Sequence, residues 1–477
     1  MVDMMTSRTV FFGGVAVVGL AAGAVPLAAQ QAPQDLLSAT RPAPTPAPTP
    51  APTQTVDQAF GDLAKPRTGE VVQPLPAPPK PILASWTAAQ ARELVSFAEG
   101  VGTEGLDPKD YRLAELKTAL AGRDPIALNE AASRTFQFLV EDLRDGRTPM
   151  EARRQWFVVD PDPDRMPTQM LLDKAVGGAG VAATLKGLNP VNPDYGKLKA
   201  ELALAKDPAR RKLIIANMDR WRWLPQALGK HYLVTNIPEQ KLRLTVNNRI
   251  IKSYRTIVGK PGRTATPQLA EMVEAVIFNP TWTVPQSIVR GEGLGAKVLG
   301  NPGWARANGY KGTKGENGWI TVVQQPGPNN SLGLMKLDMP NEHAIFLHDT
   351  PARNLFALDS RALSHGCVRV ENARELAMTM AMLGNMKTKD DIPAIQAEVS
   401  EITKSGKYTR YPLANQWPVY LTYFTMASDV DGKMTAFSDI YGRDAPVLAS
   451  FDKPRVADRA RKTDEEVVEI VDDLQTT

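Results

Sequence analysis

A thiol and three imidazoles lie within one short stretch of this sequence. Cys367 is the single cysteine of the chain, and His343, His348 and His365 are three of its four histidines. A thiol beside an imidazole can act as a nucleophile with its base, because the thiolate is the reactive species and the ring nitrogen can accept the proton. Gly366 precedes the cysteine and tolerates backbone angles closed to other residues, so main-chain N–H groups can converge beside the sulfur and bind an oxyanion. The stretch therefore predicts acyl-transfer chemistry.

Two other interpretations use the same residues. A free cysteine is often buried as a small apolar side chain, and three histidines with one cysteine can hold zinc. Zinc ligands normally come in closely spaced pairs, but the glycine between His365 and Cys367 predicts a sharp turn that disfavours such a pair. No Asp or Glu is placed as an obvious base either. We expect no metal site, and take Cys367 as the candidate nucleophile.

The rest of the chain must position this stretch, and its periodicity predicts an α+β protein. From residue 82 to 225 apolar side chains recur at three- and four-residue steps, which is typical of helices, and Gly100 and Gly146 follow two of the predicted helices as stops. This region is predicted to be a helical scaffold domain without catalytic residues of its own. Its last helix is expected from Arg211 to Leu224, ahead of a proline.

From residue 226 to 452 the apolar period becomes two, which predicts a β-rich catalytic domain. The glycine-rich segment 286–337 inside it is predicted to be loop-rich and to form a lid over the site. Asn372 with Glu375 three residues later predicts a capped helix. The expected strands and turns are 231–238, 242–246 with the turn Asn247-Asn248 into 249–259, 272–278, 343–348, and a last hairpin from 417–426 through the turn Asp431-Gly432.

The two ends of the chain differ from this globular part. Arg8 precedes an apolar run that ends at Ala29, a pattern typical of a secretory signal or, if uncleaved, of a membrane anchor. Residues 30–81 are rich in proline and predict an extended linker. The tail 453–477 is charged, with a short helix expected at 465–474. We therefore expect an exported protein whose N-terminus can serve as a membrane tether.

The charge balance gives no sign of a nucleic-acid partner. The formal net charge is +4 at pH 7, and Lys and Arg are scattered along the chain. Surfaces that bind nucleic acid concentrate basic residues instead. We expect no nucleic acid among the partners.

The segment from His348 to Val370, H-D-T-P-A-R-N-L-F-A-L-D-S-R-A-L-S-H-G-C-V-R-V, resembles the active-site signature of L,D-transpeptidases with a YkuD-type catalytic domain. That signature is a histidine, a spacer, and S-H-G-C followed one residue later by Arg or Asn. The likeness extends to the larger periplasmic members through M-D-R-W-R-W-L-P, F-N-P-T-W-T-V-P, Q-Q-P-G-P-N-N-S-L-G and G-L-D-P-K-D-Y, and covers roughly residues 86–445.

The resemblance implies a role for each matching residue. Cys367 would be the nucleophile and His348 its base, oriented by a main-chain carbonyl rather than by a carboxylate. The main-chain N–H groups of Gly366 and Cys367 would form the oxyanion hole. His343 lies outside the signature and is expected to be a surface or core residue. The residues implied to shape the pocket and hold the substrate are Ser364, His365, Arg369 and Trp282. Two alternatives stay open: His365 could only support the loop, and Arg369 could form a structural ion pair.

The resemblance also implies the reaction. The sulfur of Cys367 would attack a tetrapeptide stem of peptidoglycan, D-Ala would leave, and an amine of a second stem would resolve the thioester into a 3→3 cross-link. Carbapenems, a class of β-lactam, would acylate the same sulfur. The alternatives left open are L,D-carboxypeptidase activity, attachment of a lipoprotein to peptidoglycan, and a non-catalytic wall-binding scaffold.

One departure from the larger relatives concerns an inserted module. Those relatives carry a peptidoglycan-binding module between the helical region and M-D-R-W-R-W-L-P. Only a short segment separates Leu204 from Met218 here, so we expect that module to be missing.

Overall fold

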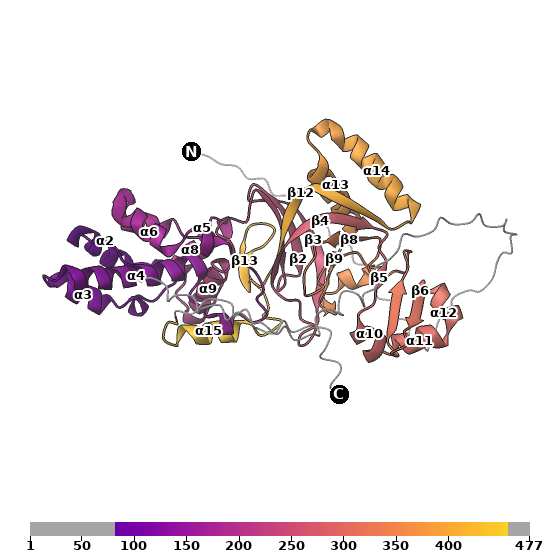
Figure 1. Ribbon diagram of the computed structural model, residues 1–477, viewed down its shortest axis with the longest axis horizontal. Coiled ribbons are helices and arrows are strands. Elements are labelled where there is room, and N and C mark those ends of the chain that lie inside the picture. The colour runs from indigo at the N-terminus through magenta and orange to yellow at the C-terminus, as the bar shows by residue number, and fades with distance from the viewer. Residues whose placement is uncertain (1–81, 457–477) are drawn as a thin grey trace, which may run out of the picture. The chain divides into compact units, whose positions relative to one another are not determined.

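The computed structural model describes residues 82–456, which form a set of helices, a large sheet and a small lid (Figure 1). The predicted signal or anchor, the linker, nearly all of the charged tail and the helix expected at 465–474 lie outside the described residues. Mixed helices and sheets confirm the predicted α+β class.

The first part of the described chain is helical, as predicted. Two helices end at Gly100 and Gly146, the stops that the sequence indicated. The last helix begins and ends earlier than predicted, because Pro208 starts it behind the capping residue Asp207. The helices are α2 (Ala88–Glu99), α3 (Leu113–Ala121), α4 (Pro125–Asp145), α5 (Asp162–Arg165), α6 (Thr168–Lys174), α7 (Val181–Lys186), α8 (Pro193–Leu204) and α9 (Pro208–Trp221).

Three of these helices start with the same local device. The side chains of Asp124, Asn192 and Asp207 each accept a hydrogen bond from a main-chain N–H of the following turn. A proline follows each of them, which suits the first helical position because the N–H that proline lacks has no partner within the helix there. Only residues 205–207 separate α8 from α9, which leaves no room for an inserted module at that point.

The catalytic part is built on one sheet that closes on itself. Nine strands have the order β10-β3-β11-β9-β8-β4-β12-β1-β2, and β3 also pairs with β2. Asn247 and Asn248 take left-handed φ angles of 50° and 58° in the hairpin between β2 and β3, which confirms the predicted tight turn. The strands are β1 (His231–Asn236), β2 (Lys241–Val246), β3 (Arg249–Gly259), β4 (Leu269–Phe278), β8 (Met335–Asp338), β9 (Leu347–His348), β10 (Ala362–Ser364), β11 (Val368–Val370) and β12 (Thr409–Thr422).

The strand predicted over 343–348 was largely wrong, because only β9 forms there. Ala344 has a φ of 51°, in the left-handed region that an extended strand does not allow. The side chain of Asn341 accepts a hydrogen bond from the N–H of Ile345 at 3.1 Å and donates one to its carbonyl at 2.8 Å. These bonds hold residues 341–345 in a turn just before β9.

The last hairpin was also placed wrongly. Residues 417–422 belong to β12, which pairs with β4 and β1 inside the main sheet. The turn at Asp431-Gly432 instead joins two separate short strands, β13 (Met426–Ser428) and β14 (Met434–Ala436). The chain then ends its described part with α15 (Asp444–Phe451).

The segment predicted to be a loop-rich lid has a regular fold of its own, which corrects that expectation. Together with residues 282–284 just before it, this segment packs a small core from Val284, Val289, Val298, Ala305 and Val322, and its end returns to the main sheet as β8. The elements are β5 (Trp282–Thr283), α10 (Gln286–Gly291), α11 (Leu294–Gly300), α12 (Pro302–Ala307), β6 (Tyr310–Lys314) and β7 (Ile320–Gln324), with the strands in the order β5-β7-β6.

Two helices, α13 (Ala373–Asn385) and α14 (Ile392–Ser405), pack on one face of the main sheet (Figure 1). The helix predicted after Asn372 therefore exists, but the predicted capping box does not. Asn372 has a φ of 52° and makes no side-chain cap, and the side chain of Glu375 pairs with Lys252 at 2.7 Å instead. The sharp turn out of β11 imposes the left-handed φ, which takes the Asn side chain out of capping position.

Several contacts join the helical part to the sheet. Trp221 stacks on Phe424 with ring centroids 4.5 Å apart, whereas Trp223 donates to Asp219. The two indoles therefore face different partners. Farther along, the N–H of Phe157 donates to the carbonyl of Gln268 at 2.9 Å, next to the start of β4.

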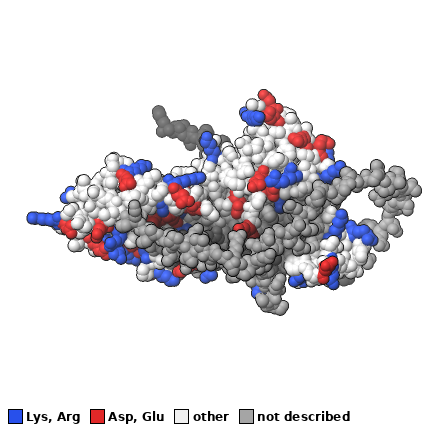
Figure 2. Space-filling model, viewed as in Figure 1, with Lys and Arg blue, Asp and Glu red and all other residues white. Residues whose placement is uncertain are grey.

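The described surface carries both signs of charge. On the face shown in Figure 2, basic and acidic side chains are interspersed. Within residues 82–456, no helix combines the length and the apolar character that crossing a membrane requires.

Candidate active site

A tight turn between β10 and β11 presents the cysteine. Gly366 has a φ of 116°, which favours glycine, and its carbonyl accepts from the hydroxyl of Thr266 at 2.7 Å. The Ser364 hydroxyl donates to the carbonyl of Cys367 at 2.6 Å and accepts from the N–H of Gly366 at 3.2 Å. Two hydroxyl groups therefore fix the backbone on both sides of the thiol.

The thiol itself is bonded to a main-chain carbonyl. The Sγ of Cys367 donates to the carbonyl oxygen of Ala344 at 3.5 Å, a distance suited to a sulfur donor. The left-handed turn at Ala344 is what aims this carbonyl at the sulfur. Cys367 is partly exposed, so its sulfur can be reached from the pocket.

His348 sits at the end of β9, between two strands that carry cations. In the sheet His348 lies opposite Arg369 of β11 and opposite Lys336 of β8, and only 4% of the residue is exposed. Its Nδ1 lies 2.5 Å from the carbonyl oxygen of Asp349. The hydrogen must therefore be on Nδ1, which leaves Nε2 with the lone pair that a base needs.

Burial keeps this imidazole neutral. It lowers the pKa of His348 from 6.5 to about 3, helped by the positive charge of Arg369 and, less, of Lys336, while main-chain contacts with Asp349 and Leu332 act in the opposite direction. Burial raises the pKa of the Cys367 thiol, against contacts with Phe346, Lys336 and Arg369. The resting pair is therefore a neutral thiol and a neutral imidazole, so proton transfer must accompany the attack on substrate.

A pocket of about 480 Å³ brings most of the predicted site residues together. Its wall combines the catalytic turn with side chains of the lid, so the lid lies over the thiol. The predicted residues that line it are Cys367, His348, Ser364, His365, Arg369 and Trp282, and the lid adds Glu292, Leu294, Lys297 and Tyr310 among others. Gly366 forms the turn beside it. The roles of these residues stay predictions.

Two of the predicted substrate-binding residues have informative surroundings. The Nε2 of His365 lies 2.9 Å from a carboxylate oxygen of Glu292 on the lid, and both side chains are about half exposed, at 46% and 55%. The Nε of Arg369 is buried without a hydrogen-bond partner, and desolvation lowers the pKa of this guanidinium. Arg369 thus makes no framework ion pair through that nitrogen.

The comparisons with known proteins agree with this geometry. Residues 230–389, which contain the whole cysteine turn and His348, match the family model of the YkuD L,D-transpeptidase catalytic domain. The chain carries a YkuD catalytic domain. This confirms the predicted family, and residues 84–202 match a family described as a scaffold domain.

Relatives of the YkuD domain are distant. A curated Haemophilus influenzae protein, provisionally named an L,D-transpeptidase, is 30% identical over 247 residues, which is 48% of this chain and 48% of that protein. The chain thus spans about half the length of the curated relative that it matches. Two solved L,D-transpeptidases are similar over 40% of this chain: one from Mycobacterium smegmatis (10% identity, 58% of that chain, TM-score 0.20) and L,D-transpeptidase 1 of Mycobacterium tuberculosis (8% identity, 61% of that chain, TM-score 0.18).

Sequence reasoning missed three residues that support the YkuD site. His343, expected at the surface or in the core, lines the catalytic pocket, and its ring packs on Phe157 with centroids 4.1 Å apart. Thr266 bonds the catalytic turn. The Asp349 carboxylate accepts from the N–H of Leu334 at 2.9 Å, so it holds the neighbouring loop and does not orient the imidazole. Of these three residues only Asp349 has a signal in the sequence, because it directly follows His348.

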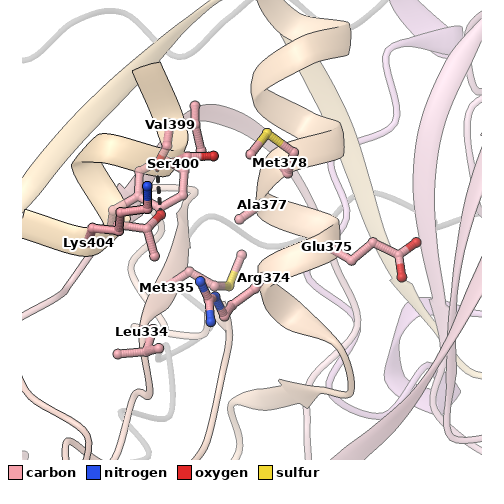
Figure 3. A pocket seen from close by; sticks show the side chains of 11 residues that line it. Leu334, Met335, Arg374, Glu375, Ala377, Met378, Val399, Ser400 and Lys404 are labelled. Atoms are coloured by element: carbon pink, nitrogen blue, oxygen red, sulfur yellow. Dashed lines mark hydrogen bonds between the residues drawn. The ribbon is translucent and has the colours of Figure 1, made fainter. Parts of the chain in front are cut away.

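A second cavity of about 330 Å³ lies between α13, α14 and β8, and Figure 3 shows the side chains that line it. Met335, Met378 and Arg374 are among them, but neither Cys367 nor His348 is. This cavity therefore does not belong to the catalytic site. Within residues 82–456, no three side chains of His, Cys, Asp or Glu gather as metal ligands.

The low pKa of His348 predicts a pH-dependent stability of the YkuD domain. In the unfolded chain this histidine takes up a proton near pH 6.5, whereas in the fold it does so only near pH 3. Above pH 6.5 this group does not change the free energy of unfolding. As the pH falls from 6.5 towards 3, the free energy of unfolding decreases by about 1.4 kcal/mol per pH unit. His348→Gln removes this loss, so between pH 7.5 and pH 4.5 the variant should lose roughly 3 kcal/mol less free energy of unfolding than wild type. Urea unfolding at the two pH values measures the difference, and equal losses in both proteins would contradict the assignment.

Proposed function

We propose that this chain is a peptidoglycan L,D-transpeptidase that joins tetrapeptide stems by 3→3 cross-links. One observation carries the proposal: a reachable thiol, Cys367, shares a lid-covered pocket with a buried, neutral imidazole, His348, inside a YkuD catalytic domain. Nucleophilic catalysis by cysteine needs this pair and no metal or organic cofactor.

The first half-reaction forms a thioester. The sulfur of Cys367 attacks the carbonyl carbon between the third residue of the stem and its terminal D-Ala, while the thiol proton passes to Nε2 of His348. The same proton then goes to the departing amine, and the bond to D-Ala breaks. Because both groups start neutral, the substrate carbonyl must be in place before the proton moves.

In the tetrahedral intermediate the carbonyl oxygen becomes negatively charged, and hydrogen-bond donors must stabilise that charge. We propose the main-chain N–H groups of Cys367 and Gly366 for this role. Removing one such donor costs about 3 kcal/mol of transition-state stabilisation. The N–H of Gly366 donates to Ser364 in the substrate-free turn, so it must turn from that hydroxyl to the oxyanion. Ser364 is thus placed to adjust the turn as the intermediate forms.

Donor binding draws on the remaining wall of the pocket. Arg369 and Lys297 supply positive charge and line it together with the aromatic rings of Trp282 and Tyr310. The stem carries free carboxylates, which suit a guanidinium in the wall of the pocket. We propose Arg369 as the principal carboxylate-binding group, with Trp282 as an apolar wall for the stem.

The second half-reaction decides between the alternatives. An amine of another stem resolves the thioester into a cross-link, water makes the chain an L,D-carboxypeptidase, and a protein lysine gives lipoprotein attachment. A non-catalytic wall-binding scaffold would need no reachable thiol. The ordered turn around Cys367 and the buried base argue against that last alternative.

Purified disaccharide-tetrapeptide incubated with the full chain tests the function directly. We expect release of free D-Ala together with a cross-linked dimer that has lost one D-Ala, both measured by mass spectrometry. Tripeptide without dimer would replace transpeptidation by hydrolysis. Unchanged tetrapeptide, under conditions where the protein is folded, would contradict the proposal.

Export belongs to the same proposal. Residues 1–29 would direct the chain to the periplasm as a cleaved signal or hold it at the membrane as an anchor, and residues 30–81 would be the linker between that segment and the enzyme. The helical scaffold of residues 82–225 would support the catalytic domain of residues 226–452. Peptidoglycan stems are the proposed partners, and carbapenems are the proposed inhibitors.

A further inference from the structure

We propose that Glu292 of the lid, held by His365, binds the ammonium group of the acceptor stem and so favours aminolysis of the thioester over hydrolysis. This inference rests on the proposed transpeptidase function and extends it to the choice of acceptor.

The charges that line the pocket point to Glu292. Among the described residues that line it, Glu292 is the one carboxylate, whereas Lys297 and Arg369 are cations. The donor stem brings carboxylates, which the cations can bind, but the acceptor enters as an ammonium group. An ammonium group is bound most strongly by a carboxylate, so one side chain of the pocket has the charge that the acceptor requires.

Glu292 lies in the sharp connection between two short helices of the lid and lines the pocket. Glu292 lies between α10 and α11 and is followed by Gly293, whose φ of 69° makes the turn that glycine permits. The side chain is 55% exposed, and one of its oxygens lies 2.9 Å from the Nε2 of His365. The carboxylate of Glu292 therefore lies next to the catalytic turn and can be reached from solvent.

The sequence places this position close to the thioester. His365 is separated from Cys367 only by Gly366, so a group bound by the His365–Glu292 pair lies beside the turn that carries the acyl group. His348, in contrast, is only 4% exposed, whereas the side chains of His365 and Glu292 are about half exposed. The base and the proposed acceptor-binding pair thus differ in how solvent reaches them.

The chemical step balances without another reactant. The bound ammonium group releases one proton to solvent and becomes a neutral amine. Its nitrogen forms a bond to the thioester carbonyl carbon, and the C–S bond breaks. The second proton of the nitrogen passes through Nε2 of His348 to the sulfur of Cys367, which restores the free thiol.

A purely mechanical role for the pair makes a different prediction. If the contact between Glu292 and His365 only latched the lid, its loss would weaken donor binding and acylation together with aminolysis. If Glu292 binds the acceptor, acylation stays as it is and only the fate of the thioester changes. Glu292→Gln separates these roles, because it removes the charge and keeps the size.

The experiment uses the full chain and three proteins: wild type, Glu292→Gln and, as a matched control, Glu316→Gln. Glu316 is an exposed glutamate of the same lid that does not line the pocket. Acylation by meropenem is followed by mass, and disaccharide-tetrapeptide is then turned over at increasing concentrations of the acceptor. We expect Glu292→Gln to acylate within about twofold of wild type, but to lower the dimer-to-tripeptide ratio by roughly five- to tenfold through a higher acceptor KM.

Each outcome decides one point. A dimer-to-tripeptide ratio equal to that of wild type, or an acylation rate that falls in parallel with it, overturns the acceptor role of Glu292. A similar fall in Glu316→Gln shows a general effect of lid charge and overturns it as well. Wild type that forms neither adduct nor dimer contradicts the proposed function itself, and so is distinguished from failure of this inference.

Discussion

Replacing Cys367 with alanine is expected to abolish covalent capture of a carbapenem. Wild type should gain the mass of one meropenem molecule, because the sulfur opens the β-lactam ring and the base returns the proton within the same complex. In Cys367→Ala no other nucleophile takes over, since the chain has a single thiol. Transpeptidation should fall to background at the same time.

Loss of the adduct in Cys367→Ala can be attributed to the missing thiol, because the substitution is small. The side chain of Cys367 is small and partly exposed, and its thiol is hydrogen-bonded to the carbonyl of Ala344, so alanine should leave the fold intact. Circular dichroism and the unfolding midpoint provide the control. An adduct of unchanged mass in the folded variant would remove Cys367 as the nucleophile and with it the proposed mechanism.

Replacing His348 with alanine is expected to slow acylation by a factor of 10²–10⁴, the usual contribution of a positioned base. The loss should be largest at neutral pH and shrink as the pH rises, because hydroxide then generates the thiolate that His348 otherwise produces at the moment of attack. Wild type should show no rate change near pH 6.5, since its imidazole stays neutral down to a pKa of about 3. Stopped-flow measurement of β-lactam ring opening between pH 5 and pH 9 gives both profiles.

The chain offers a matched control for this variant. His231 lies outside the pocket, where its ring packs on Trp417 with centroids 4.4 Å apart. His231→Ala should therefore keep the wild-type acylation rate. Near-wild-type acylation in His348→Ala, or an equal loss in His231→Ala, would show that the imidazole of His348 is not the base.

The cysteine turn could be predicted because its sequence constrains the backbone directly. Gly366 is needed where φ is positive, and a short strand follows Cys367 as its β-branched neighbours indicate. The scaffold helices were predictable for a related reason, since their apolar spacing and their stops at Gly100 and Gly146 are local signals.

Other parts depended on contacts that the sequence does not show. The extended-looking residues before His348 became a turn because Asn341 bonds back to Ile345, and the cap expected at Asn372 was lost to the turn out of β11. The lid looked like a loop because its core is formed by only a few residues from short elements. His343 could not be assigned to the pocket, because the packing of Phe157 joins segments far apart in the chain.

The hydrogen bond from the thiol to Ala344 has a consequence for the lifetime of the protein. Oxidants such as peroxide attack the thiolate, and a thiol that is protonated, partly shielded and bonded to a carbonyl reacts slowly with them. In the proposed mechanism the thiol gives up its proton to His348 only while a stem occupies the pocket, so the thiolate is present only then. The single cysteine can thus resist oxidation where no reductant is present, and it stays available for acylation.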